Sequence, residues 1–140
     1  MTRDEIQQFF DRRTAAWRRA DVDALTGDHA ENCVIESPLA GEVRGRAAIE
    51  NLYRGFLGSF PDFAIDDVEL VIEDNRVVQI ATMSGTNTGG FMGLPPTGKR
   101  FKFPVVAVYT FENRLIVHER RIYDFTGMLT QIGVLKAKPV

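Results

Sequence analysis

The chain has 140 residues, of which 44% are hydrophobic and 26% are charged, and its net charge is −2. This length and composition predict one globular domain over residues 1–140, with enough apolar side chains to form a core. The nearly balanced charge gives no support to a nucleic-acid-binding groove or a basic membrane-binding patch. We therefore expect neither nucleic acid nor a membrane as a partner.

Residues that bind metals or form disulfides are scarce. Cys33 is the only cysteine, so no intramolecular disulfide can form, and with two well-separated histidines it makes no persuasive zinc site. No stretch has the length and apolarity of a membrane span, and the charged N-terminus lacks the apolar core of a signal peptide. We therefore expect a cytoplasmic protein without a bound metal.

The N-terminal region predicts a long helix. Thr2 and Glu5 have the spacing of a capping box, and the residues that follow place Phe10 and Trp17 on one apolar stripe. Arg13 interrupts this stripe. Its side chain either extends along the surface to solvent or reaches a polar cavity.

A short helix, a strand and a second long helix are predicted next. Asp21 restarts a helix that Gly27 ends, and residues 33–37 have the composition of a strand. Residues 39–45 predict a turn into the second long helix, which ends before Pro61 because proline cannot continue it.

The second half of the chain predicts strands. They cover residues 63–72, 76–87, 101–111 and 115–124, with a loop rich in glycine and proline over residues 88–100. We expect an irregularity at Asp66 and Asp67, and a short closing helix with Asp124 as its N-cap. This order predicts an α+β domain in which N-terminal helices pack against one face of a curved antiparallel sheet.

Three motifs carry a family resemblance. They are GRAAI at residues 45–49, GTNTG leading into GLPPTG within residues 85–98, and DFTG with QIG within residues 124–133. With these motifs the chain resembles the SnoaL-like polyketide cyclase group of the NTF2-like superfamily. The resemblance implies a cone-shaped domain that encloses an apolar pocket for a small hydrophobic molecule, works without a cofactor and forms a homodimer.

The family's catalytic residues are replaced in this chain. Arg121 stands where characterised cyclases of the group have the aspartate that serves as acid and base, and Ala107 takes the place of the partner histidine. A guanidinium stays protonated, so Arg121 cannot remove a proton from a substrate. Ser37 stands at the position of the base of ketosteroid isomerases, and Arg121 also replaces an acid that enzymes of the limonene-epoxide-hydrolase type need. These three known mechanisms are therefore disfavoured.

The family position of Arg121 implies that its side chain faces the cavity. Alternation along the strand then puts Glu119 and Tyr123 on the same face, with the intervening residues on a face available to another subunit. Glu119 and Arg121 are close enough to form a buried structural ion pair. Alternatively, Arg121 binds a carboxylate, enolate or phenolate, with Glu119 or Glu36 as the base, or it lies at the surface.

Aromatic residues are the candidates for lining the pocket: Trp17, Tyr53, Phe91, Phe103 and Tyr109. The Tyr109 hydroxyl is a suitable donor to a ligand carbonyl if it faces inward, although simple core packing is the competing interpretation for Tyr53, Phe103 and Tyr109. The place of Trp17 on the first helix resembles a pocket-lining position in the cyclases. Phe91 lies in the loop over residues 89–98, which either covers the pocket mouth or contacts a second subunit.

The leading hypothesis is a cofactor-independent cyclase, isomerase or lyase acting on a small hydrophobic carbonyl compound. Arg121 would stabilise negative charge, Glu119 or Glu36 would move the proton, and Tyr109 or Asn87 would orient the carbonyl. Asn87 is included because it keeps a neutral donor and acceptor at the expected pocket rim. The alternative is a non-catalytic module that binds a hydrophobic ligand or a partner protein, since the known acids and bases are absent.

Overall fold

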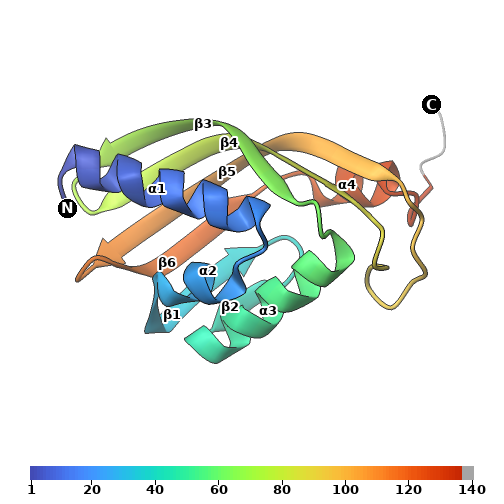
Figure 1. Cartoon of the computed structure of the whole chain (residues 1–140), viewed down its shortest axis with the longest axis horizontal. Helices are drawn as coiled ribbons and strands as arrows, with labels where there is room; N and C mark the ends of the chain where they lie inside the picture. The colour runs from blue at the N-terminus through green and yellow to red at the C-terminus, as the bar shows by residue number, and fades with distance from the viewer. Residues whose placement is uncertain (137–140) are drawn as a thin grey trace.

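In the computed structural model, which describes residues 1–136, helices lie against one face of a curved six-stranded sheet (Figure 1). The helices are α1 (Arg3–Arg18), α2 (Val22–Gly27), α3 (Arg46–Ser59) and α4 (Phe125–Gln131). The strands are β1 (His29–Ser37), β2 (Gly41–Arg44), β3 (Ala64–Glu73), β4 (Arg76–Thr86), β5 (Arg100–Glu112) and β6 (Leu115–Ile122). Within the described residues, every helix is too short or too polar to cross a bilayer. The expected α+β architecture is confirmed.

The predicted helix caps are present. The Thr2 side chain accepts a hydrogen bond from the Glu5 backbone at 3.1 Å, and the Glu5 carboxylate accepts one from the Thr2 backbone at 2.9 Å. Asp124 accepts from the Gly127 backbone at 2.8 Å and so caps α4, as expected. These bonds satisfy backbone donors that have no partner inside their own helices.

The sheet is mixed, and the expectation of an antiparallel sheet was wrong at one pair. The strand order is β2-β1-β6-β5-β4-β3, and β1 and β6 run parallel while the other neighbours are antiparallel. Two strands can lie parallel only when a long connection carries the chain back between them. Here α3 and the four strands β2, β3, β4 and β5 provide it, so that the last strand pairs with the first (Figure 1).

The first hairpin differs from the sequence prediction. β1 begins at His29, four residues earlier than expected, and β2 occupies residues that we had predicted as a turn. β2 is a short edge strand with only one partly buried residue, Val43, so it lacks the alternating apolar pattern of a strand. The tight turn between the two strands lies over residues 38–40, and Ser37 pairs with Gly41 at its base.

Three irregularities interrupt the strand registers, one of them in the pairing of β1 with β6 between His29 and Val34. The register of β3 with β4 shifts between Asp66 and Glu69, and Asp67 has a φ of +54°, which confirms the expected irregularity. In β6 one extra residue, Val117, separates the partners of Phe111 and Thr110 on β5. This bulge precedes Glu119, so side chains alternate regularly through the rest of β6.

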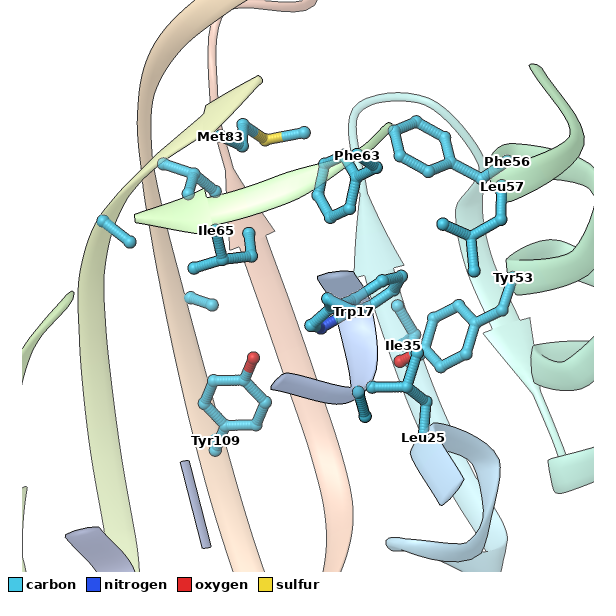
Figure 2. Packing of buried hydrophobic residues seen from close by; sticks show 14 of the residues in the cluster. Trp17, Leu25, Ile35, Tyr53, Phe56, Leu57, Phe63, Ile65, Met83 and Tyr109 are labelled. Atoms are coloured by element: carbon cyan, nitrogen blue, oxygen red, sulfur yellow. The ribbon is translucent and has the colours of Figure 1, made fainter. Parts of the chain in front are cut away.

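Aromatic side chains fill the space between sheet and helices (Figure 2). The Trp17 ring lies edge-on to Tyr53 at 4.9 Å and to Phe63 at 5.0 Å between ring centres. The Tyr109 hydroxyl points from the sheet into the same interior (Figure 2). Residues of α1, α3 and β5 thus meet in one core.

Replacing Asp124 by Ala should lower the free energy of unfolding by about 1 kcal/mol, because the first turn of α4 loses its cap. Urea denaturation measures this change. Asp124→Asn is the matched control and should retain most of the stability, since asparagine caps helices equally well. An equal loss in both variants would contradict the capping role of Asp124.

Candidate functional site

Arg121 reaches the interior from β6. Glu119 is fully buried and the Arg121 side chain is 18% exposed, whereas Arg120 and Ile122 lie on the opposite, solvent-facing side. The expected alternation is therefore present. Ala107 lies directly opposite Arg121 on β5, and its small side chain leaves space for the guanidinium.

Two acceptors hold the Arg121 guanidinium in place. Its Nε donates to Glu119 Oε2, and its Nη2 donates to the Tyr53 hydroxyl oxygen at 3.2 Å. The guanidinium carbon also lies 5.6 Å from the centre of the Trp17 ring and 5.5 Å from that of Tyr53, within range of cation–π attraction. Among residues 1–136, no hydrogen bond engages Nη1. One face of the fork is thus available to a ligand.

Glu119 and Arg121 form a charged pair inside the protein. Burial alone would raise the pKa of Glu119, but the charge of Arg121, with a smaller contribution from Arg13, outweighs it and lowers the pKa. Burial would lower the pKa of Arg121, but the Glu119 carboxylate reverses this effect and raises it. Both groups therefore stay ionised. Glu119 Oε1 has no hydrogen-bond partner among the described residues.

A second charged group lies where α1 approaches α2 and β1. The Arg13 side chain is only 2% exposed, and its Nη1 donates to Asp28 at 2.9 Å and to the Leu25 carbonyl at 3.0 Å. Arg12 binds the same carboxylate from outside at 2.6 Å. Of the two alternatives for Arg13, the structure therefore shows the buried one, in which the side chain points inward to polar partners.

His29 is a buried residue that the sequence prediction missed. Its Nε2 lies 2.9 Å from the Tyr53 hydroxyl oxygen, and its Nδ1 lies 3.3 Å from Cys33 Sγ. Burial, helped by the charge of Arg13, lowers the pKa of His29 to about 3, so the ring is neutral. We had placed the start of the strand after His29. Glu31 and Asn32 are both exposed, so the alternation along β1 is interrupted and the sequence carried no signal for the inward position of His29.

The enclosed cavity beside Arg121 is small, about 20 Å³ in volume. Its polar lining comes from Ser37, Tyr53, Arg121 and Tyr123, and its apolar lining from Leu39, Leu52, Phe56 and Met83. This space holds about one water molecule, whereas sites for small organic ligands measure about 300 Å³ or more. The interior is therefore not the enclosed apolar pocket that we expected.

Open hollows flank the β1–β2 turn on two sides. One, of about 370 Å³, shares Leu39, Leu52 and Phe56 with the cavity, and the other, of about 390 Å³, shares Ser37 and Arg121 with it. Leu39 of the turn, together with Leu52 and Phe56 of α3, lies between the cavity and the first hollow, and Ser37 and Arg121 lie between the cavity and the second. Arg121 lines the cavity and also the larger hollow.

Glu36 does not face the interior with Glu119, and this expectation is corrected. Ile35 points into the core, so its neighbour Glu36 points to the outer face of the sheet. There Glu36 Oε2 lies 2.7 Å from His118 Nε2. Glu36 meets Arg121 only at the rim of the larger open hollow.

Asn87 also has a different role from the one expected. It is fully buried, its Nδ2 donates to Thr97 at 3.1 Å, and its Oδ1 accepts from the Gly90 backbone at 3.1 Å. Both ends of its amide are therefore used to hold the loop after β4. Asn87 is not at the rim of the cavity.

Tyr109, Phe91 and Phe103 are buried but do not line the cavity. The Tyr109 hydroxyl donates to Gln79 at 3.4 Å, and burial raises the pKa of Tyr109. Phe103 stacks on Tyr123 with ring centres 5.6 Å apart. Phe91 packs against Phe60 beneath the apolar hollow.

No three His, Cys, Asp or Glu side chains gather as metal ligands would within residues 1–136. The polar groups near Arg121 are of other kinds. They comprise one ion pair, two ring hydroxyls and a neutral imidazole.

The helix-covered curved sheet and its buried polar interior define an α+β domain of the ketosteroid isomerase-like class. A protein of that fold from Catenulispora acidiphila, crystallised with trimethylamine, superposes with a TM-score of 0.73 at 17% sequence identity, covering 86% of this chain and 88% of that one. The chain belongs to the SnoaL-like polyketide cyclase family, whose sequence model matches residues 7–132.

Two Streptomyces proteins share more sequence. AclR from Streptomyces galilaeus, a proposed hydroxylase, is 27% identical with a TM-score of 0.83, covering 99% of this chain and 87% of that one. IdmH from Streptomyces antibioticus, a proposed polyketide cyclase, is 26% identical with a TM-score of 0.75, covering 91% of this chain and 97% of that one. No curated protein sequence matches significantly.

Replacing Glu119 by Gln should lower the free energy of unfolding at pH 7 by about 3 kcal/mol, because Arg121 is left as a largely buried, uncompensated charge. The pKa of Glu119 is lower in the folded protein than in the unfolded chain, where it is about 4.3. Ionised Glu119 therefore stabilises the fold fully at pH values above about 4.3, and this stabilisation is lost as the pH falls through the folded pKa. The difference between wild type and variant should therefore shrink below about pH 4.

Urea denaturation at pH 7 and pH 3 measures this effect. Glu36→Gln is the matched control and should change stability by less than about 1 kcal/mol, because its contact with His118 is half exposed. If the two substitutions lowered the free energy of unfolding equally at pH 7, the Glu119–Arg121 pair would stabilise the fold no more than a contact at the surface does.

Proposed function

We propose that this protein is a cofactor-independent enzyme of the cyclase, isomerase or lyase type that acts on a small hydrophobic carbonyl compound. The observation that supports this proposal is the position of Arg121, whose unengaged Nη1 lies on a guanidinium fixed between the cavity and an open hollow. A fixed donor in a largely water-excluded site stabilises negative charge that develops on a carbonyl oxygen. The similarity to IdmH, a proposed polyketide cyclase, is consistent with this chemistry.

In this proposal Arg121 stabilises the enolate oxygen and Glu119 accepts the proton through Oε1. The low pKa of Glu119 makes it a weak base, and the charge of Arg121 compensates by lowering the basicity of the enolate as well. Glu119 does not line the closed cavity. The substrate must therefore enter beyond Arg121 before the proton can move.

Substrate would enter by movement of the β1–β2 turn, whose Leu39 lies between the cavity and the apolar hollow. Displacement of Leu39 would join the cavity to the apolar hollow of about 370 Å³. The hydrocarbon part of the substrate would then contact Leu52, Phe56 and Met83, with its carbonyl at Arg121. Loop movements of this kind admit substrate in many enzymes.

A non-catalytic binding module is the second candidate. It is favoured by the ion pair itself, since Arg121 already neutralises the one carboxylate that faces this interior from β6. Such a module would bind the same class of ligand without moving a proton.

Deuterium exchange distinguishes the two candidates. In D₂O the wild-type protein should catalyse the exchange of deuterium for the protons next to the carbonyl of hydrophobic cyclic ketones. The loss of these proton signals in the NMR spectrum measures the exchange rate. Arg121→Lys, which keeps the charge but loses the fork, should lower the exchange rate by about 100-fold, the usual effect of losing one oxyanion donor. Glu119→Gln should abolish exchange because no base remains.

Arg114→Met removes an exposed arginine in a distant turn and should leave exchange unchanged. Exchange that survives in both site variants would contradict the assigned roles. Ketone binding without any exchange by wild type would favour the binding module.

We also propose that the protein forms a homodimer through the outer face of its sheet. Two registered rows of apolar side chains cross this face: Val71, Val78 and Val108 in one, and Ile80, Val106 and Ile122 in the other. Ile80 and Ile122 are 37% and 50% exposed. The first row continues into Arg120, and the second row begins at Glu69. When a second copy packs against this face with its rows reversed, Arg120 of one copy would lie near Glu69 of the other.

Analytical ultracentrifugation should therefore show a dimer for wild type and a monomer for the double variant Ile80→Glu/Ile122→Glu, because carboxylates would be buried in the interface. Leu135→Glu introduces the same charge at another exposed apolar residue and should leave the dimer intact. A monomeric wild type, or a dimer that survives the double substitution, would refute this interface.

A further inference from the structure

A continuous hydrogen-bond chain leads from β1 to Arg121. Cys33 Sγ lies 3.3 Å from His29 Nδ1, His29 Nε2 lies 2.9 Å from the Tyr53 hydroxyl, and this hydroxyl lies 3.2 Å from Arg121 Nη2. The first three of these residues are at most 1% exposed. The catalytic roles proposed above do not use His29 or Cys33.

Donor and acceptor rules give this chain a direction. A guanidinium can only donate, so the Tyr53 oxygen accepts from Arg121 Nη2. The Tyr53 proton then points to His29 Nε2, which must be unprotonated, and the single ring proton of His29 lies on Nδ1 and points to Cys33 Sγ. The other tautomer would leave the Tyr53 proton without an acceptor among the described residues.

His29 is itself held in place. Its backbone carbonyl accepts hydrogen bonds from Arg46 Nε at 3.0 Å and from Arg46 Nη2 at 2.7 Å. Arg46 belongs to the GRAAI motif at the start of α3, so this helix fixes the beginning of β1. Burial keeps the His29 ring neutral, with its pKa lowered to about 3, and therefore able to accept a proton donor at neutral pH.

We propose that His29 is a positioning residue for the Arg121 site: it fixes the Tyr53 hydroxyl so that its oxygen faces Arg121 and the guanidinium keeps Nη1 toward the ligand. The benefit for catalysis rests on the function proposed above. The orientation of Tyr53 and Arg121 does not depend on that function, and it can be measured without any ligand.

The tautomer of His29 is the first test. His118→Asn removes the only other histidine, which lies on the outer face, and leaves His29 as the single imidazole in the NMR spectrum. Nitrogen-15 correlation spectra at pH 7 should show a protonated Nδ1 and an unprotonated Nε2. A protonated Nε2 would overturn the proposal, because Tyr53 could then not donate to it.

The mobility of Arg121 is the second test. Rotation of its guanidinium, measured by carbon-13 and nitrogen-15 relaxation, should be slow in wild type and faster in His29→Leu. His29→Gln should restore slow rotation, since its amide oxygen can replace Nε2 as the acceptor. Equal rotation rates in wild type and His29→Leu, with both proteins folded, would overturn the proposal.

Ligand affinity is the third test, with cyclohexanecarboxylate as the probe and the fluorescence of Trp17, the only tryptophan, as the signal. His29→Leu and Tyr53→Phe should each weaken binding about tenfold, the effect of one hydrogen bond to a charged group. The double variant should bind no worse than Tyr53→Phe alone, because His29 acts through that hydroxyl. Additive losses would contradict the positioning role.

A wild-type protein that shows the expected tautomer and slow guanidinium rotation, but binds neither this probe nor a ketone, would refute the proposed function and leave the positioning of Tyr53 and Arg121 supported.

Discussion

The ion pair between Glu119 and Arg121 is the interaction on which the interior of this protein depends. A guanidinium that is only 18% exposed requires a neighbouring negative charge, and the fully buried Glu119 provides it from the same strand. Tyr53 supplies a second acceptor and Trp17 a ring face. Because Glu119 holds Nε and Tyr53 holds Nη2, the remaining Nη1 has a defined direction. This part of the core thus holds an oriented positive group, in addition to Arg13, which lies between α1, α2 and β1.

Arg121 stands where the characterised cyclases have an acidic residue, and this difference changes the chemistry that the site can perform. Characterised cyclases of this family carry an aspartate at this position, which can give and take a proton, whereas a guanidinium can only stabilise negative charge. Ala107, opposite Arg121 in the register, makes this exchange sterically possible because it leaves space where those enzymes have a histidine. Any proton acceptor must therefore come from elsewhere, and Glu119 is the carboxylate nearest to the guanidinium.

Much of the fold could be predicted from local rules. The capping box at Thr2, the cap at Asp124 and the alternation from Glu119 to Tyr123 follow from short spacings, and the structure has all of them. The parallel pairing of β1 with β6 could not be predicted, since it joins residues far apart in sequence. Glu36 was misplaced because its face depends on where β1 enters the sheet. The position of His29 was hidden by a register shift between His29 and Val34, which breaks the alternation that would have revealed it.

The central claim is that Arg121 offers Nη1 to an oxygen of the ligand. The most direct measurement is a crystal structure of the protein with cyclohexanecarboxylate. We expect one carboxylate oxygen within hydrogen-bond distance of Nη1, the ring against Leu52 and Phe56, and the β1–β2 turn displaced from its closed position. A probe bound away from Arg121 over an unmoved turn, with Nη1 bonded to another protein group, would contradict this claim.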